Sequence, residues 1–175
     1  MMPRFYLTAA LIVLFLLEGT VVQILSPQNL DLTLMTVPRF ALVGALMVSL
    51  ILGRREGLFY GMAIGFLHDV LFGNLIGVYT LSMMVASYFA GLGVVLFHRS
   101  VVVTFTTITV VLFGHEWLVY SLFRVFSDTA INVQWVLTQQ IIPSVVLNVL
   151  FAMLVYVPLS RLCEAVWARR EKVAE

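Results

Sequence analysis

Apolar and polar positions divide this chain into six apolar segments separated by polar connections. Hydrocarbon offers no partner to a free backbone N–H or C=O group, so each segment satisfies its backbone inside a membrane only as a helix. The pattern therefore predicts an all-α integral membrane protein with six transmembrane helices in a single membrane domain, 1–175. The expected spans are residues 5–25, 38–53, 57–73, 76–97, 101–126 and 140–162, with 163–175 as a cytoplasmic tail.

Two of these segments are short, and one lies at the amino end. The second and third have roughly 16 residues, or about 24 Å of helix, against a hydrocarbon core of about 30 Å. Their ends must be covered by protein or by a locally thinned bilayer. The first segment, at about 21 residues, is too long for a signal-peptide core and is expected to stay in the mature protein.

The third segment, on which we expect the chain to be organised, repeats glycine at every fourth position and breaks the repeat once, with an aspartate. Positions four apart share one face of a helix, so the glycines predict a shallow groove that another helix can approach closely. The occupant of this groove is either a partner protein or another helix of the same chain. The expected helix-packing or partner-binding residues are Gly57, Gly61, Gly65, Asp69, Gly73 and Gly77.

Composition and charge support a membrane protein and predict its orientation. Apolar residues make up 62% of the chain, charged residues 11%, and the mean hydropathy is +1.06, which argues against a water-soluble enzyme. With six spans, one side receives eight of the ten basic residues, and the positive-inside rule places both termini in the cytoplasm. The longer connections, 26–37 and 127–139, then face outward. The eight are Arg4, Arg54, Arg55, Arg99, Arg161, Arg169, Arg170 and Lys172, and the other two are Arg39 and Arg124.

Ionisable groups inside apolar segments are costly unless they are paired or face protein. The Glu18 carboxylate would either bind a transported proton or cation, or form a hydrogen bond to another helix. We favour the bond, because no second carboxylate shares that segment. Asp69 lies at a segment end, and we expect it to accept hydrogen bonds from backbone amides of the turn through Gly73, in preference to binding an ion or substrate. His68 points about 100° away from Asp69, so the two do not form a dyad.

The fifth segment carries the pair His115 and Glu116 near its middle and Arg124 further on. Glu116 and Arg124 are separated by about 12 Å of helix, so we expect pairing across helices, for example with Glu18. The residues expected to be buried polar groups are Glu18, Glu116 and Asn148.

Sequence templates for catalysis and for cofactor or metal binding are absent. His115-Glu116 lacks the second histidine of a zinc-protease motif because valine stands at 119, and no G-x-S-x-G elbow is present. Cys163 is the only cysteine, which excludes an intrachain disulfide and a cysteine-rich metal site. The sequence has no cluster of basic residues of the kind that binds nucleic acid. We therefore predict a protein that is not an enzyme and holds no cofactor or metal.

Two stretches together resemble one membrane-protein family. Gly61-x-x-x-Gly65-x-x-x-Asp69-x-x-x-Gly73-x-x-x-Gly77, preceded by Pro38-Arg39-Phe40, resembles the rod shape-determining MreD family. Ile142-Pro143-Ser144 with Leu147-Asn148, followed by Val157-Pro158-Leu159, is similar to the last span of that family, particularly in Gram-positive members. The resemblance covers about half of the chain.

This resemblance implies a non-catalytic scaffold of the cell-elongation machinery, multi-pass in the bacterial cytoplasmic membrane. It implies MreC as the main partner, with the actin-like MreB, RodA and a class B penicillin-binding protein in a larger complex, and a possible homodimer. The function implied is support of peptidoglycan synthesis and rod shape. The family is also similar in fold to the six-helix substrate-binding subunits of energy-coupling-factor transporters, so the alternative is a substrate-capture subunit for a vitamin-like molecule. A weaker alternative, an ion-coupled transporter, depends on Glu18 and Glu116.

Overall fold

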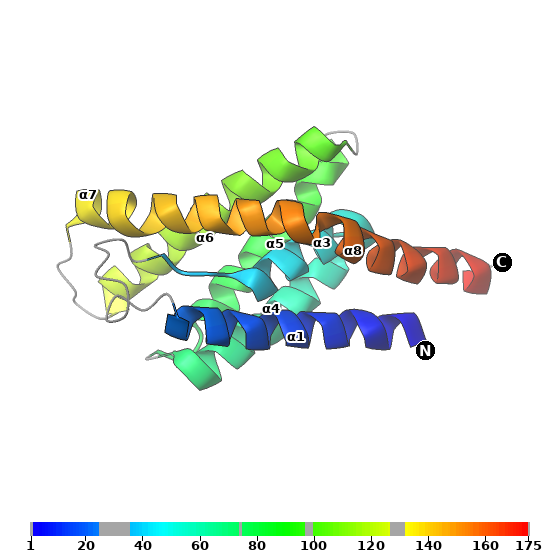
Figure 1. Cartoon of the computed structure of the whole chain (residues 1–175), viewed down its shortest axis with the longest axis horizontal. Coiled ribbons are helices and arrows are strands. Elements are labelled where there is room, and N and C mark those ends of the chain that lie inside the picture. The colour runs from blue at the N-terminus through cyan, green and yellow to red at the C-terminus, as the bar shows by residue number, and fades with distance from the viewer. Residues whose placement is uncertain (1, 25–35, 74, 97–99, 127–131, 175) are drawn as a thin grey trace.

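The structure, a computed structural model, describes residues 2–24, 36–73, 75–96, 100–126 and 132–174. All of its regular elements within these ranges are helices, which confirms the all-α prediction (Figure 1). They are α1 (Met2–Ile24), α3 (Phe40–Leu52), α4 (Arg54–Phe72), α5 (Val78–Leu96), α6 (Val101–Phe126), α7 (Val133–Val136), the π-helix η1 (Leu137–Ile141) and α8 (Ile142–Ala174).

Each of the six predicted segments is helical, but two boundaries differ from the expected ones. Residues 54–56, expected to be a connection, form the first turn of α4, because Gly53 with φ 105° already breaks the chain after α3. Residues 133–139, expected in the connection 127–139, form α7 and the start of η1. The tail expected from 163 continues the last helix, α8, as far as Ala174. The connections expected at 26–37, 73–75 and 98–100 lie partly outside the described residues, which omit 25–35, 74 and 97–99.

In the part of the chain that the structure describes, four helices are long and apolar enough to cross a membrane: Arg4–Val22, Val78–Val95, Val101–Phe126 and Val133–Arg169. Many large apolar side chains on their outer faces are exposed, as lipid contact requires. α3 has only 13 residues, about 20 Å of helix, and α4 begins with three charged residues. The protein is therefore a multi-pass membrane protein, and crossing by all six segments stays a prediction.

α3 forms the centre of the bundle. Twelve of its 13 residues are buried. It packs against α1, α4, α5 and α8, and Figure 1 shows it enclosed between α1 and α8. Its sequence, FALVGALMVSLIL, is apolar on every side, which is typical of a helix surrounded by protein.

The glycine face of α4 lies against α3 and α5 of the same chain. A Cβ atom at Gly57 would come within 2.2 Å of the Ser49 side chain in α3. At Gly61 and Gly65 it would come within 2.6 Å of backbone carbonyl oxygens in α5. Of the two occupants that the sequence left open, the structure places the chain's own helices in this groove.

Gly73 and Gly77 border the turn between α4 and α5. The Gly73 N–H donates a hydrogen bond to the Asp69 carbonyl oxygen over 3.2 Å and ends α4. Gly77 has a φ of 104°, a backbone conformation that favours glycine because it has no Cβ. These two glycines therefore set the path of the chain into α5.

The two ends of the described chain lie at the same end of the bundle. α1 and α8 run in opposite directions, so the start of α1 and the end of α8 meet on one side (Figure 1). The end of α1, the α4–α5 turn, the end of α6 and the start of α8 lie toward the opposite side.

Candidate functional site

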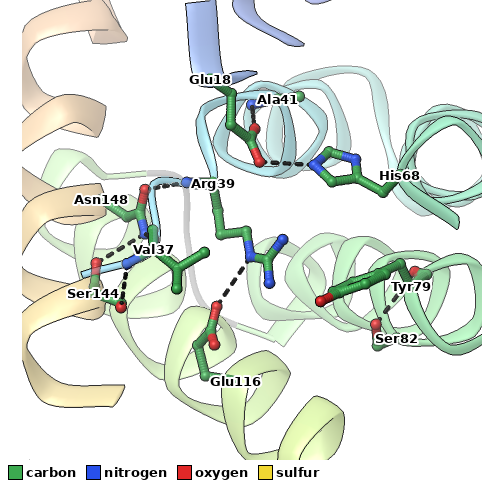
Figure 2. Close-up of polar contacts among 10 residues, drawn as sticks. All are labelled: Glu18, Val37, Arg39, Ala41, His68, Tyr79, Ser82, Glu116, Ser144 and Asn148. Atoms are coloured by element: carbon green, nitrogen blue, oxygen red, sulfur yellow. Dashed lines mark hydrogen bonds and ion pairs between the residues drawn. The ribbon is translucent and has the colours of Figure 1, made fainter. Parts of the chain in front are cut away.

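A cluster of buried polar side chains joins five segments of the bundle (Figure 2). It lies near the end of α1, the end of α4 and the start of α8, in the half of the bundle away from the termini (Figure 1). It brings together Glu18 of α1, Arg39 just before α3, His68 of α4, Glu116 of α6 and Asn148 of α8. Their exposed fractions lie between 1% and 6%. Such groups are stable in a membrane interior only when they are paired, so the pairing decides what this cluster can do.

Arg39 pairs with Glu116. The guanidinium Nε donates to Glu116 Oε1 over 3.2 Å, and its central carbon lies 4.8 Å from the ring centroid of Tyr79, a cation–π distance. The expectation that Glu116 pairs across helices and not with Arg124 is confirmed, but the partner is Arg39 and not Glu18. The sequence had counted Arg39 only among the basic residues on the outer side of the membrane. Arg124 is exposed and lies outside the cluster.

Glu18 connects three helices. Its Oε1 lies 2.7 Å from His68 Nε2, and its Oε2 accepts a hydrogen bond from the Ala41 N–H over 3.1 Å. Ala41 is in the first turn of α3, where N–H groups lack partners within the helix, so the carboxylate of α1 satisfies one of them. The geometry matches the helix-to-helix bond favoured for Glu18 from the sequence.

α8 fixes the chain that leads into α3. Asn148 Oδ1 accepts from the Arg39 backbone N–H over 2.7 Å, and Asn148 Nδ2 donates to the Val37 carbonyl oxygen over 3.1 Å. Ser144 Oγ accepts from the Val37 N–H over 2.9 Å. Three backbone groups in this extended stretch are thus satisfied by two side chains of α8, because no helix or sheet partner is present there.

His115 is buried next to Glu116 in the chain but forms none of the hydrogen bonds of the cluster. It is 2% exposed, and neither ring nitrogen has a hydrogen-bond partner among the described residues. Within the described part of the chain, no three histidine, cysteine or acidic side chains are grouped closely enough to hold a metal ion. The cluster as a whole is a set of bonds between helices, and both of its carboxylates are bonded to neighbouring segments.

Asp69 joins the end of α4 to the start of α5. Its Oδ1 accepts from the Tyr79 N–H over 2.9 Å, and its Oδ2 accepts from the Thr80 N–H over 2.8 Å and from the Thr80 hydroxyl. The prediction that Asp69 accepts hydrogen bonds from backbone amides is confirmed, but these amides are at the start of α5 and not in the turn through Gly73. The free N–H groups of a helix start are good donors for a carboxylate. Asp69 is 1% exposed and caps the next helix in place of its own turn.

Replacing Asp69 with alanine should lower the unfolding free energy by about 1–2 kcal/mol, the usual cost of losing a helix cap. Asp69→Asn should cost less, since one oxygen acceptor remains. Denaturant unfolding of the purified protein in detergent would measure both. Equal stability of Asp69→Ala and the unchanged protein would show that the cap contributes nothing.

A cavity of about 420 Å³ lies beside the polar cluster. Arg39, Glu18 and His68 line it, and Glu116 does not. Its other walls come from the end of α1, the end of α4, the start of α5, the end of α6 and the α7–η1 region. They include Gly19, Phe72, Tyr79, Phe123 and Gln140.

The structure thus gathers the three predicted buried polar residues, Glu18, Glu116 and Asn148, into one cluster and places the glycine face elsewhere. Sequence reasoning missed Arg39 and His68 as members. A signal for Arg39 was present, since a cation at the start of an apolar helix opposes the helix dipole and needs a nearby anion. For His68, which lies one residue before Asp69, the pattern held no comparable signal.

Comparison with known proteins gives a consistent result. Residues 3–166 match the family model described as rod shape-determining protein MreD. The chain is 22% identical over 157 residues to the rod shape-determining protein MreD of Bacillus subtilis (strain 168), covering 90% of this chain and 91% of that protein. No solved structure matches.

Proposed function

We propose that this chain, which belongs to the rod shape-determining protein MreD family, acts as a non-catalytic membrane scaffold of the cell-elongation machinery. The observation that carries the proposal is the family match, which extends over residues 3–166 and so includes every described helix in whole or in part. Family membership implies a role in rod shape determination. The scaffold activity, with MreC as the direct partner, is the finer step proposed here.

The polar contacts support a structural role. The Arg39–Glu116 and Glu18–His68 pairs each join two segments of the bundle. The side chains of Asn148 and Asp69 form hydrogen bonds with backbone groups of neighbouring segments. These bonds hold the helices in a fixed arrangement, which a scaffold needs in order to present a constant surface to its partners.

The partner surface must lie on the outside of the bundle. Gly57, Gly61 and Gly65 contact α3 and α5, so no partner helix can enter that groove while the chain is folded. Exposed apolar side chains remain on several helices, among them Phe66 on α4 and Leu154 on α8. We propose that MreC contacts such a face, and that MreB, RodA and a class B penicillin-binding protein join the complex with it.

The common position of the two chain ends supports the proposed orientation. Placing the end of the bundle that holds the start of α1 and the end of α8 in the cytoplasm also places Arg4, Arg161 and Arg169 there, as the positive-inside rule favours (Figure 1). The polar cluster and its cavity then lie toward the outer half of the membrane.

Photo-crosslinking in living cells tests the proposed contact with MreC. A photoreactive amino acid would replace one exposed residue on each outer face: Ile12 of α1, Phe66 of α4, Val110 of α6 and Leu154 of α8. We expect crosslinks to MreC from one face and few from the others, because a scaffold presents a specific surface.

Depletion of the protein is the companion experiment, with microscopy as the readout. Rods should become round, and a plasmid copy should restore them. Crosslinking that is absent from all four faces, or equal on all of them, would contradict a specific contact with MreC. An unchanged cell shape after depletion would contradict the role in shape itself.

A further inference from the structure

The cavity beside the polar cluster has the size and the wall chemistry of a small-molecule site. Its volume of about 420 Å³ falls within the range of about 300–1,000 Å³ that is typical of such sites. Phe72, Tyr79 and Phe123 supply aromatic surface, and charged side chains that are more than nine-tenths buried lie at its wall. An apolar pocket with a few fixed polar groups is the usual form of a binding site.

The Glu18–His68 pair contributes no net charge to this wall. His68 Nδ1 lies 3.0 Å from the Ile64 carbonyl oxygen, which can only accept, so Nδ1 carries a proton. His68 Nε2 and Glu18 Oε1, 2.7 Å apart, must then share a further proton, held by one or the other. In either arrangement the charges of the two side chains sum to zero.

Arg39 is therefore the cation at the cavity wall, since a guanidinium stays protonated in proteins. Its counter-charge, Glu116, is not among the lining residues, and it accepts the hydrogen bond from Arg39 Nε. The central guanidinium carbon lies 4.8 Å from the Tyr79 ring centroid. Figure 2 shows the two terminal nitrogens on the side facing Tyr79, away from Asn148.

We propose that this cavity binds a small amphipathic anion, with a phosphate or carboxylate group against the terminal nitrogens of Arg39 and an apolar body against Phe72, Tyr79 and Phe123. A guanidinium presents several donors in one plane and binds such oxyanions in a fixed geometry. Such an anion has two sources: the head group of a lipid entering from the membrane, or a water-soluble organic anion.

Matched probes test the charge requirement on the full-length protein, purified in the non-ionic detergent dodecyl maltoside. Phenyl phosphate represents a soluble anion and phenol its uncharged counterpart. Dihexanoyl phosphatidic acid represents a lipid, with dihexanoyl glycerol as its uncharged counterpart. Native mass spectrometry and isothermal titration would measure binding. We expect at least one anionic probe to bind about tenfold more tightly than its counterpart, or better, because a charge-assisted hydrogen bond is lost in the uncharged molecule.

The pair of probes also identifies the source. Selective binding of phosphatidic acid would support a lipid ligand, and selective binding of phenyl phosphate would support a soluble one. If neither anion binds more tightly than its counterpart, the proposal is wrong. The binding assay contains no MreC, so this failure would leave the proposed scaffold function standing.

Two variants locate the binding. Gly19→Leu should fill the cavity, since Gly19 lines it and a Cβ there meets Phe72 only at an ordinary contact distance of 3.5 Å. Gly114→Leu is the matched control, because nothing lies within 4 Å of a Cβ at this exposed position of α6. We expect Gly19→Leu to weaken anion binding about tenfold or more and Gly114→Leu to leave it unchanged. Equal binding by both variants would overturn the assignment to this cavity.

A double variant isolates the charge. Arg39→Gln combined with Glu116→Gln removes the cation and its buried counter-charge together, so no isolated charge is left in the bundle. We expect it to bind anionic and uncharged probes equally. Retained preference for the anion would show that Arg39 is not the recognition group. Should this variant fail to fold, the glycine pair still decides the location and the matched probes the charge.

Discussion

Replacing Arg39 with alanine is expected to lower the unfolding free energy by about 3–5 kcal/mol, because it leaves a buried carboxylate without its cation. Glu116 is 3% exposed, and within the described residues Arg39 is its ion-pair partner. The loss would be measured by denaturant unfolding in detergent and by the fraction of protein that elutes as a single species from size-exclusion chromatography.

A compensating change distinguishes the lost pair from a simple loss of packing. Adding Glu116→Gln to Arg39→Ala removes the isolated charge and should recover much of the stability, because the penalty comes from an uncompensated buried ion. Arg39→Lys keeps the charge but loses the planar guanidinium over Tyr79, so we expect a smaller loss than for alanine. A double variant no more stable than Arg39→Ala would show that the ion pair does not determine the effect.

Replacing Gly65 with leucine is expected to disrupt the bundle, with a loss of at least about 3 kcal/mol, at the upper end of overpacking effects. Even a Cβ at Gly65 would lie 2.6 Å from the Tyr79 carbonyl oxygen and 2.7 Å from the Thr80 Cα. Backbone of α5 cannot move aside as a flexible side chain would. The measurement is the yield of folded protein and its unfolding transition in detergent.

Gly114→Leu is the control, since it adds the same side chain where nothing lies within 4 Å. It should fold and unfold like the unchanged protein. The comparison also bears on any binding assay, because loss of MreC binding by Gly65→Leu would follow from misfolding alone. A folded and stable Gly65→Leu protein would mean that α4 and α5 are not in close contact at this position.

The apolar pattern predicted the helices well, because a long apolar segment in a membrane has no alternative to a helix. It predicted less about which helix is central. The spacing of glycines in α4 indicated a possible partner surface. The helix that the others enclose is instead α3, which is apolar on all its faces. Uniform apolarity is itself a sign of burial within a protein, and it would have pointed to α3.

The polar contacts could not be predicted from the sequence to the same degree. Helical spacing shows which residues share a face, but not which face of another helix it meets. Arg39 and Glu116 are 77 positions apart, and Glu18 and His68 are 50 apart. Sequence reasoning therefore identified Glu18, Glu116 and Asn148 as buried polar groups without finding their partners. Asp69 was expected near a turn, and its partners lie in the next helix.

The attachment of the α3 start to α8 has a consequence for synthesis of the protein. Asn148, which accepts the Arg39 backbone N–H, is 109 positions further along the chain. A nascent chain that has emerged only as far as α6 therefore cannot yet satisfy the backbone ahead of its central helix. Maturation of the core must wait until the last helix has left the ribosome, and products truncated before α8 should be recognised by membrane proteases as incomplete.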